Sequence, residues 1–109
     1  MSATAPGRCR KARGSAKEAR RIAKAVVEQR LAACVNILDG RILSIYRWKG
    51  KVESGKEFLL VIKTSRRRFA LLQKKIEQLH SYDVPEIIAL PIVAGARGYL
   101  AWIADSVRS

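Results

Sequence analysis

The stretch of residues 15–38 most constrains the fold, because its hydrophobic pattern changes period partway along. In its first half, apolar residues recur every three or four positions between basic residues, which predicts an amphipathic helix. Ser15 and Glu18 have the spacing of a capping box at the start of that helix. Residues 32–38 are then almost continuously apolar and end at Asp39-Gly40, a turn dipeptide. The stretch therefore predicts a half-buried helix that leads directly into a buried strand.

The next segment predicts a two-stranded ribbon followed by a strand. Residues 42–48 are rich in strand-forming side chains, Lys49-Gly50 is a tight-turn candidate, and the return strand begins at Val52. Residues 58–62 are apolar at every position. A strand with two apolar faces needs cover on both of them.

The last third of the chain predicts two helices with a strand between them. Thr64 or Ser65 is placed to cap the first of these helices. Apolar residues recur every three or four positions in both helices. They are Phe69, Leu72, Ile76 and Leu79 in the first helix, and Leu100, Ile103 and Val107 in the final one. Residues 86–92 predict the intervening strand, with Pro91 at a sheet edge or at the strand end.

The formal net charge of +13 over 109 residues would ordinarily indicate a nucleic acid or an anionic surface as partner. The basic run at residues 66–68, however, is interpreted as the solvated first turn of a helix, and no aromatic platform lies between the basic residues. Nucleic acid is therefore kept only as an alternative partner. No apolar run approaches the roughly 20 residues that a membrane span needs, so no membrane partner is expected.

The first 14 residues differ in character from the rest. No acidic residue precedes Glu18, and residues 7–13 read Gly-Arg-Cys-Arg-Lys-Ala-Arg. The segment lacks the apolar stretch of a signal peptide, which leaves a transit peptide and a solvated basic tail as alternatives. Two cysteines form no disulfide framework, so a reducing, cytoplasmic setting is expected.

The order of predicted elements indicates one α+β domain. A ferredoxin-like sandwich, with an antiparallel sheet and helices on one face, would need one more strand before the first helix. The apolar strands also need cover on the face away from the helices, and a chain of 109 residues has no second layer to supply it. A second copy of the chain is the natural cover, so an oligomer is expected.

Several segments resemble the CutA divalent-cation tolerance proteins, in order EQRLAACVNI, SIYRWKGKVE, LLVIKT, LHSYDVPEIIALPI and GYLAWI. The resemblance runs from about Ser15 to the C-terminus and divides the chain into a basic segment, 1–14, and a CutA-like domain, 15–109. It implies a ferredoxin-like protomer in a PII-like homotrimer, with a long β-ribbon between neighbours and interface positions at Tyr46, Trp48 and Trp102. It also implies a role in tolerance of copper and other divalent metals, without a catalysed reaction.

The resemblance weakens at the start of the chain. Family members open with an apolar strand that ends in a Thr-Ala-Pro-like turn, and this strand is central in their sheet. Residues 7–13 are taken to occupy that place here, yet neither of their alternating faces is apolar, and burying unpaired arginines is costly. The strand forms with its long side chains reaching outward, or it is absent, or the segment is an artefact of the reading frame.

The resemblance also suggests candidate site residues. His80, the only histidine, matches a proposed copper ligand of some family members, and Cys9 lies near the position of its proposed cysteine partner. Lys63, Tyr82 and Glu86 are expected near His80 in a cleft between subunits.

Each of these assignments has an alternative. His80 is also compatible with a structural role in its loop, and the cleft residues with a PII-like site for a small signalling ligand. Cys34, in the apolar strand, is interpreted as a core residue. No cofactor is required, and Cu(II) or another divalent metal is the candidate ligand. The sequence has no Gly-rich phosphate loop, paired-carboxylate motif or Ser-His-Asp spacing, so an enzyme is not predicted.

Overall fold

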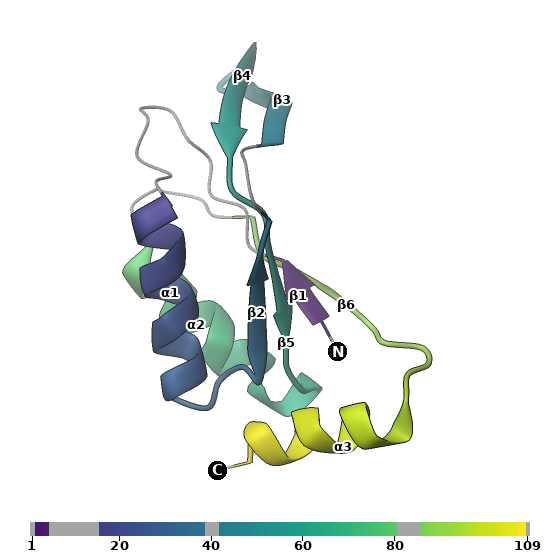
Figure 1. Ribbon diagram of the computed structural model, residues 1–109. Helices are drawn as coiled ribbons and strands as arrows, with labels where there is room; N and C mark the ends of the chain where they lie inside the picture. The colour runs from purple at the N-terminus through teal and green to yellow at the C-terminus, as the bar shows by residue number, and fades with distance from the viewer. Residues whose placement is uncertain (1, 5–15, 39–41, 81–85, 109) are drawn as a thin grey trace.

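The computed structural model describes residues 2–4, 16–38, 42–80 and 86–108. Within them the chain forms a four-stranded sheet, a two-stranded ribbon and three α-helices (Figure 1). The elements, in order, are β1 (Ser2–Thr4), α1 (Ala16–Glu28), β2 (Cys34–Ile37), β3 (Ile42–Trp48), β4 (Lys51–Glu57), β5 (Leu60–Lys63), the 3-10 turn η1 (Arg66–Arg68), α2 (Phe69–Leu79), β6 (Ile88–Leu90) and α3 (Arg97–Ser106).

The main sheet has the order β2-β5-β1-β6, and all its pairings are antiparallel. The strands on either side of α1, β1 and β2, are separated by β5, and those on either side of α2 are separated by β1. This interleaving of two split βαβ units is the ferredoxin-like arrangement. The predicted α+β fold class is confirmed.

The strand that the fold requires before the first helix comes from Ser2–Thr4. Ala3 pairs with Ile62 of β5 on one side and with Ala89 of β6 on the other, so β1 is central in the sheet. Residues 7–13, the predicted place of this strand, lie outside the described residues. Thr4-Ala5-Pro6 begins at the last residue of β1 and matches the Thr-Ala-Pro-like turn that the resemblance implies after the first strand.

The helices α1 and α2 cover one face of the sheet, as predicted (Figure 1). Each contributes its apolar stripe, and β5 contributes alternate residues, because side chains along a strand point to opposite faces in turn. The most deeply buried side chains at this interface are Ile22, Val26, Leu60, Ile62, Leu72 and Ile76. The helix faces assigned from the apolar spacing are confirmed.

Two local predictions were wrong in detail at the ends of β5. The strand predicted over 58–62 begins at Leu60, because the chain first completes the ribbon strand β4 through Glu57. Thr64 does not cap the next helix; its buried hydroxyl donates to the carbonyl oxygen of Leu31 at 2.7 Å, and the side chain of Ser65 makes no capping hydrogen bond either. Thr64 instead joins β5 to the loop after α1.

The ribbon β3-β4 extends away from the sheet and helices, which gives the protein extents of 44 × 25 × 24 Å (Figure 1). It closes at Lys49 and Gly50, whose φ angles of 50° and 79° are both positive. Two consecutive residues with positive φ define a type I′ turn, whose twist matches that of the flanking strands. The predicted turn is confirmed.

The C-terminal segment adds a second, smaller core. The strand β6 ends at Leu90 because Pro91 has no N–H to donate, so it is shorter than the predicted 86–92. From α3, Ile103 packs with Val107 and with Ala33 from the loop before β2. Among the described helices, none has the length and apolar character to cross a membrane.

Candidate functional site

The predicted metal and ligand residues are only partly visible in the structure. Cys9 and Tyr82 lie outside the described residues. His80, Lys63 and Glu86 are described: His80 follows α2, Lys63 ends β5, and Glu86 precedes β6. Their roles as ligands stay predictions, and their positions decide whether one protomer can bring them together.

His80 is the C-terminal cap residue of α2 and is half-buried. Its backbone N–H donates to the carbonyl oxygen of Ile76 at 2.8 Å, while Arg21 from α1 donates to the carbonyl oxygen of Leu79 at 3.0 Å. These bonds fix the backbone beside the imidazole. The C-terminal end of a helix also favours positive charge close to it, which suits a bound cation.

Lys63 lies at the opposite end of the sheet from His80 and Glu86. In the register of the sheet, Ser2 pairs with both Lys63 and Leu90, whereas Thr4 pairs with Val61 and Ile88. Glu86 lies four residues before Leu90, a length of about 13 Å in extended chain. Within one protomer the strand register therefore separates Lys63 from Glu86, and the predicted cleft needs a second copy of the chain to bring Lys63 near the other two.

No group of three or more metal-binding side chains (His, Cys, Asp or Glu) occurs among the residues that the structure describes. Cys34 is half-buried in β2, and its Sγ lies 3.9 Å from Oδ1 of Asn36. A tight site for a transition metal needs several suitable ligands in a fixed geometry. A metal site that includes His80 would therefore need ligands from another subunit or from outside the described residues.

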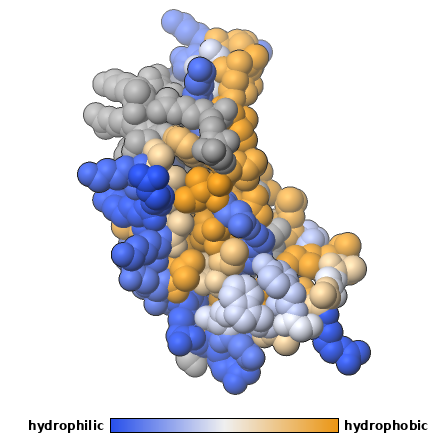
Figure 2. Space-filling view, viewed as in Figure 1, coloured by the Kyte–Doolittle hydropathy of each residue, from blue (hydrophilic) through white to orange (hydrophobic). Residues whose placement is uncertain are grey.

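One face of the ribbon carries exposed apolar side chains. Leu43 and Ile45 lie two residues apart on β3, so they project from the same face. Val52 of β4 pairs with Arg47, the next residue on that face, so it projects from the same side. They are 61%, 72% and 66% exposed. Figure 2 shows this apolar surface along the ribbon, in contrast to the hydrophilic surface over α1. We call these three residues the ribbon apolar face.

The other face of the ribbon carries the predicted aromatic interface residues. Tyr46 and Trp48 are half-buried, and so is Ser44, which shares their face. The hydroxyl of Ser44 donates to Oε2 of the buried Glu57 at 3.1 Å, a bond that fixes the base of the ribbon. Reasoning from the sequence selected the aromatic residues and missed the ribbon apolar face, although the apolar residues at positions 43 and 45 were its visible sign.

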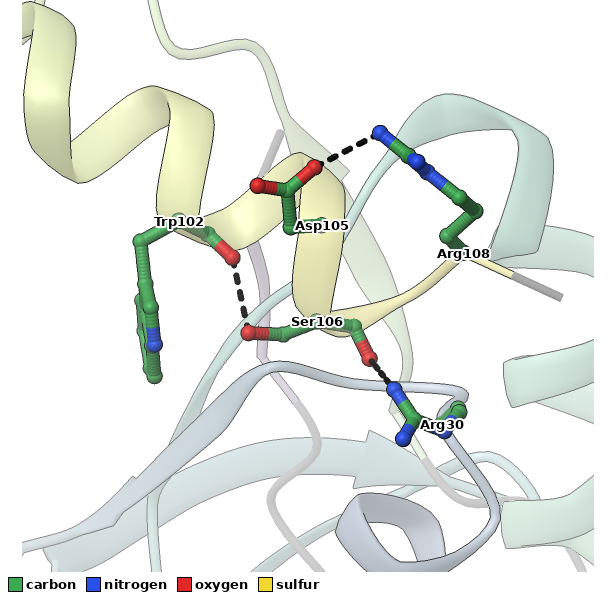
Figure 3. A network of polar contacts seen from close by, with 5 residues as sticks. All are labelled: Arg30, Trp102, Asp105, Ser106 and Arg108. Carbon is green, nitrogen blue, oxygen red and sulfur yellow. Dashed lines mark hydrogen bonds and ion pairs between the residues drawn. The ribbon is translucent and has the colours of Figure 1, made fainter.

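Trp102, the third predicted interface residue, lies on α3 and is 46% exposed. Its ring lies 5.6 Å from that of Tyr99, centroid to centroid, at 33°. The end of this helix is tied down by hydrogen bonds: Ser106 Oγ donates to the carbonyl oxygen of Trp102 at 2.7 Å, and Arg30 reaches the carbonyl oxygen of Ser106 at 3.5 Å (Figure 3). The two rings form an exposed aromatic surface on a fixed helix.

Comparison with protein families gives one match that covers most of the chain. The model of the CutA1 divalent ion tolerance protein family matches residues 12–106. Among curated proteins, "Divalent-cation tolerance protein CutA" of Thermus thermophilus is 52% identical over 92 residues, which are 84% of this chain and 88% of that protein. "Protein CutA, chloroplastic" of Arabidopsis thaliana is 47% identical over 90 residues, 83% of this chain and 49% of that protein.

Comparison with solved structures agrees. The divalent cation tolerance protein (Cut A1) from Thermus thermophilus superposes with a TM-score of 0.89 and 44% identity, over 99% of this chain and 100% of that one. The chain spans about half the length of the plant and mammalian relatives it matches. The likeness to the bacterial protein therefore covers nearly the whole of both chains, whereas the likeness to the eukaryotic proteins covers one portion of them.

Proposed function

Because the chain belongs to the CutA1 divalent ion tolerance family, we propose that it acts in cellular tolerance of divalent metal cations, as a homotrimer and without catalysing a reaction. The observation that carries the proposal is the match of residues 12–106 to the family, together with 52% identity to the divalent-cation tolerance protein of Thermus thermophilus. That name describes the relative, and its extension to this chain is our inference.

The ribbon apolar face supports the homotrimer. Large apolar side chains that gather on one exposed face are typical of an interface between chains, and the ribbon carries three of them beside Arg47, Ser54 and Lys56. The ribbon extends beyond the body of the protomer, so it can reach a neighbouring copy (Figure 1). A cleft that joins Lys63 to His80 and Glu86 would need Lys63 from a second copy, because the strand register separates these residues within one protomer.

His80 and Glu86 support a divalent metal as the ligand. They are an imidazole and a carboxylate at the same end of the sheet, and both groups bind divalent transition metals. Copper(II) is the metal we propose, held by His80 with help from a neighbouring subunit. Cys9 and Tyr82 remain proposed members of the metal and cleft sites.

The proposal also includes the absence of catalysis and a cytoplasmic location. The family is named for ion tolerance and not for a reaction. The cytoplasm fits a half-buried cysteine that is not in a disulfide, although the Arabidopsis relative is named as chloroplastic. Fractionation of cells that express the chain from its own promoter would test the location.

The function is tested by growth under metal stress. A bacterial strain that lacks its own protein of this family would express the chain, and its growth would be followed across a series of copper(II) concentrations. We expect the chain to restore growth, and the His80→Ala variant to restore less of it at equal protein level. A chain that is folded and abundant but gives no protection against copper, zinc or cobalt would contradict the proposed function.

A further inference from the structure

A pocket of about 450 Å³ lies between the start of α2 and the end of α3, away from the residues proposed to bind metal. It is lined by three arginines, one serine and three apolar residues: Ser65, Arg67, Arg68, Leu71, Ala104, Val107 and Arg108. None of the described residues that line it is acidic. Its volume is in the range of pockets that bind small molecules, and its charge favours an anion.

The walls of the pocket are fixed by one of the arginines. Nε of Arg68 donates to the carbonyl oxygen of Val107 at 2.7 Å, and this bond joins η1 to the residue that follows α3, both of which line the pocket. Arg68 is half-buried, and Val107 belongs to the smaller core. The sequence predicts that residues 66–68 form a solvated helix turn. In the structure Arg68 makes a hydrogen bond to the backbone, whereas Arg67 is exposed and lines the pocket.

Two further guanidinium groups line the pocket with their donors accessible. Arg67 is exposed. Arg108 donates to Oδ1 of Asp105 at 2.7 Å, and the side chains of this pair are 75% and 67% exposed (Figure 3). An ion pair so exposed contributes little free energy, so a stronger anion can displace Asp105 from Arg108. The hydroxyl of Ser65, which makes no capping bond, adds a neutral donor.

We propose that this pocket binds a small ligand that carries phosphate groups. A planar guanidinium donates two parallel hydrogen bonds to phosphate oxygens, which is why arginine predominates where phosphates are bound. Two accessible arginines from separate elements, η1 and the end of the chain after α3, suit two adjacent phosphate groups better than a single monoanion. This site is independent of the proposed metal tolerance, since it shares no residue with the His80 end of the sheet.

The test is calorimetric titration of the whole purified protein with pyrophosphate at low ionic strength. Arg67→Gln should weaken binding by about tenfold, because a hydrogen bond to a charged group is lost. Arg20→Gln is the matched control: Arg20 is exposed on α1, outside the pocket, and the substitution changes the net charge equally. Asp105→Asn releases Arg108 and should tighten binding about two- to fivefold, whereas Glu77→Gln, which removes an exposed acid from α2, should not.

Circular dichroism melting shows that each variant is folded before its affinity is compared. Weaker binding by Arg67→Gln with unchanged binding by Arg20→Gln supports the site. Equal weakening by both variants would show attraction by overall charge and would overturn it. So would a wild-type protein that binds no pyrophosphate at millimolar concentration, or an Asp105→Asn variant with an effect no larger than that of Glu77→Gln.

Discussion

Replacement of Ile45 by aspartate should dissociate the proposed trimer while leaving the protomer folded. Ile45 lies in the middle of the ribbon apolar face and is 72% exposed in the single chain. Its backbone position in the β3-β4 ladder, opposite Ser54, is open to either side chain. An aspartate there stays in water in the protomer and is buried only if a neighbour covers the ribbon.

The exposed fractions of these side chains give the size of the expected effect on the free energy of association. Leu43, Ile45 and Val52 are 61%, 72% and 66% exposed, so together they leave about two whole apolar side chains in water. Full burial of one such side chain stabilises the state in which it is buried by about 1.5–3 kcal/mol. The ribbon apolar face would thus contribute about 3–6 kcal/mol to the free energy of each contact between subunits. Aspartate removes about 1–2 kcal/mol of this and adds a desolvation cost of several kcal/mol for a buried carboxylate. The substitution should cancel the contribution of the ribbon.

Size-exclusion chromatography with light scattering, over a range of micromolar concentrations, measures the outcome. Val93→Asp is the control, because Val93 is 93% exposed in the segment after β6 and the change in charge is the same. We expect the wild type and Val93→Asp to be trimeric and Ile45→Asp to be monomeric, with the same far-ultraviolet circular dichroism. A trimer that survives Ile45→Asp would refute the assignment of the ribbon apolar face to an interface.

Three further predictions concern single residues. Thr64→Val should lower the free energy of unfolding by about 1–3 kcal/mol, because the buried Leu31 carbonyl loses its donor at 2.7 Å; an unchanged urea midpoint would count against this bond. Gly50→Ala should cost about 1 kcal/mol, since φ of 79° strains any side chain there, and Gly50→Asn should cost less; equal midpoints for the two variants would contradict the turn assignment. His80→Ala should abolish specific Cu(II) binding in calorimetry and leave the oligomer intact; stoichiometric binding by the variant would place the metal elsewhere.

The sequence predicted most of the fold because its strongest patterns are local. The stripe of α1, the Lys49-Gly50 turn and the apolar run of β5 each carry their information within a few residues. The first strand does not. Ser2–Thr4 is too short to show an alternating pattern in the sequence, and its place is set by pairing with β5 and β6, which lie far along the chain. Thr4-Ala5-Pro6 is a local sign of it, and it is followed at once by a run of basic residues that is untypical of a central strand.

The candidate sites were harder to predict than the fold. The sequence selected His80 and Glu86 by resemblance, and the structure places both at one end of the sheet, yet Lys63 lies at the other. No periodic pattern tells which end of a sheet a residue occupies; that needs the strand register. The arginine pocket was missed for the same reason, since Arg67 and Arg108 are brought together only by the packing of α3 beside η1.

The central position of β1 has a consequence for folding. Ala3 pairs with Ala89, which lies 86 residues later in the sequence. Contacts so distant in sequence form slowly, since closing the intervening loop costs entropy. The ribbon and the α1-β2 unit consist of segments close in sequence and can form early. One edge of β5, in contrast, stays open until β1 pairs with it. Removal of β1 would expose one edge of β5 and detach β6 from the sheet, and exposed strand edges favour aggregation.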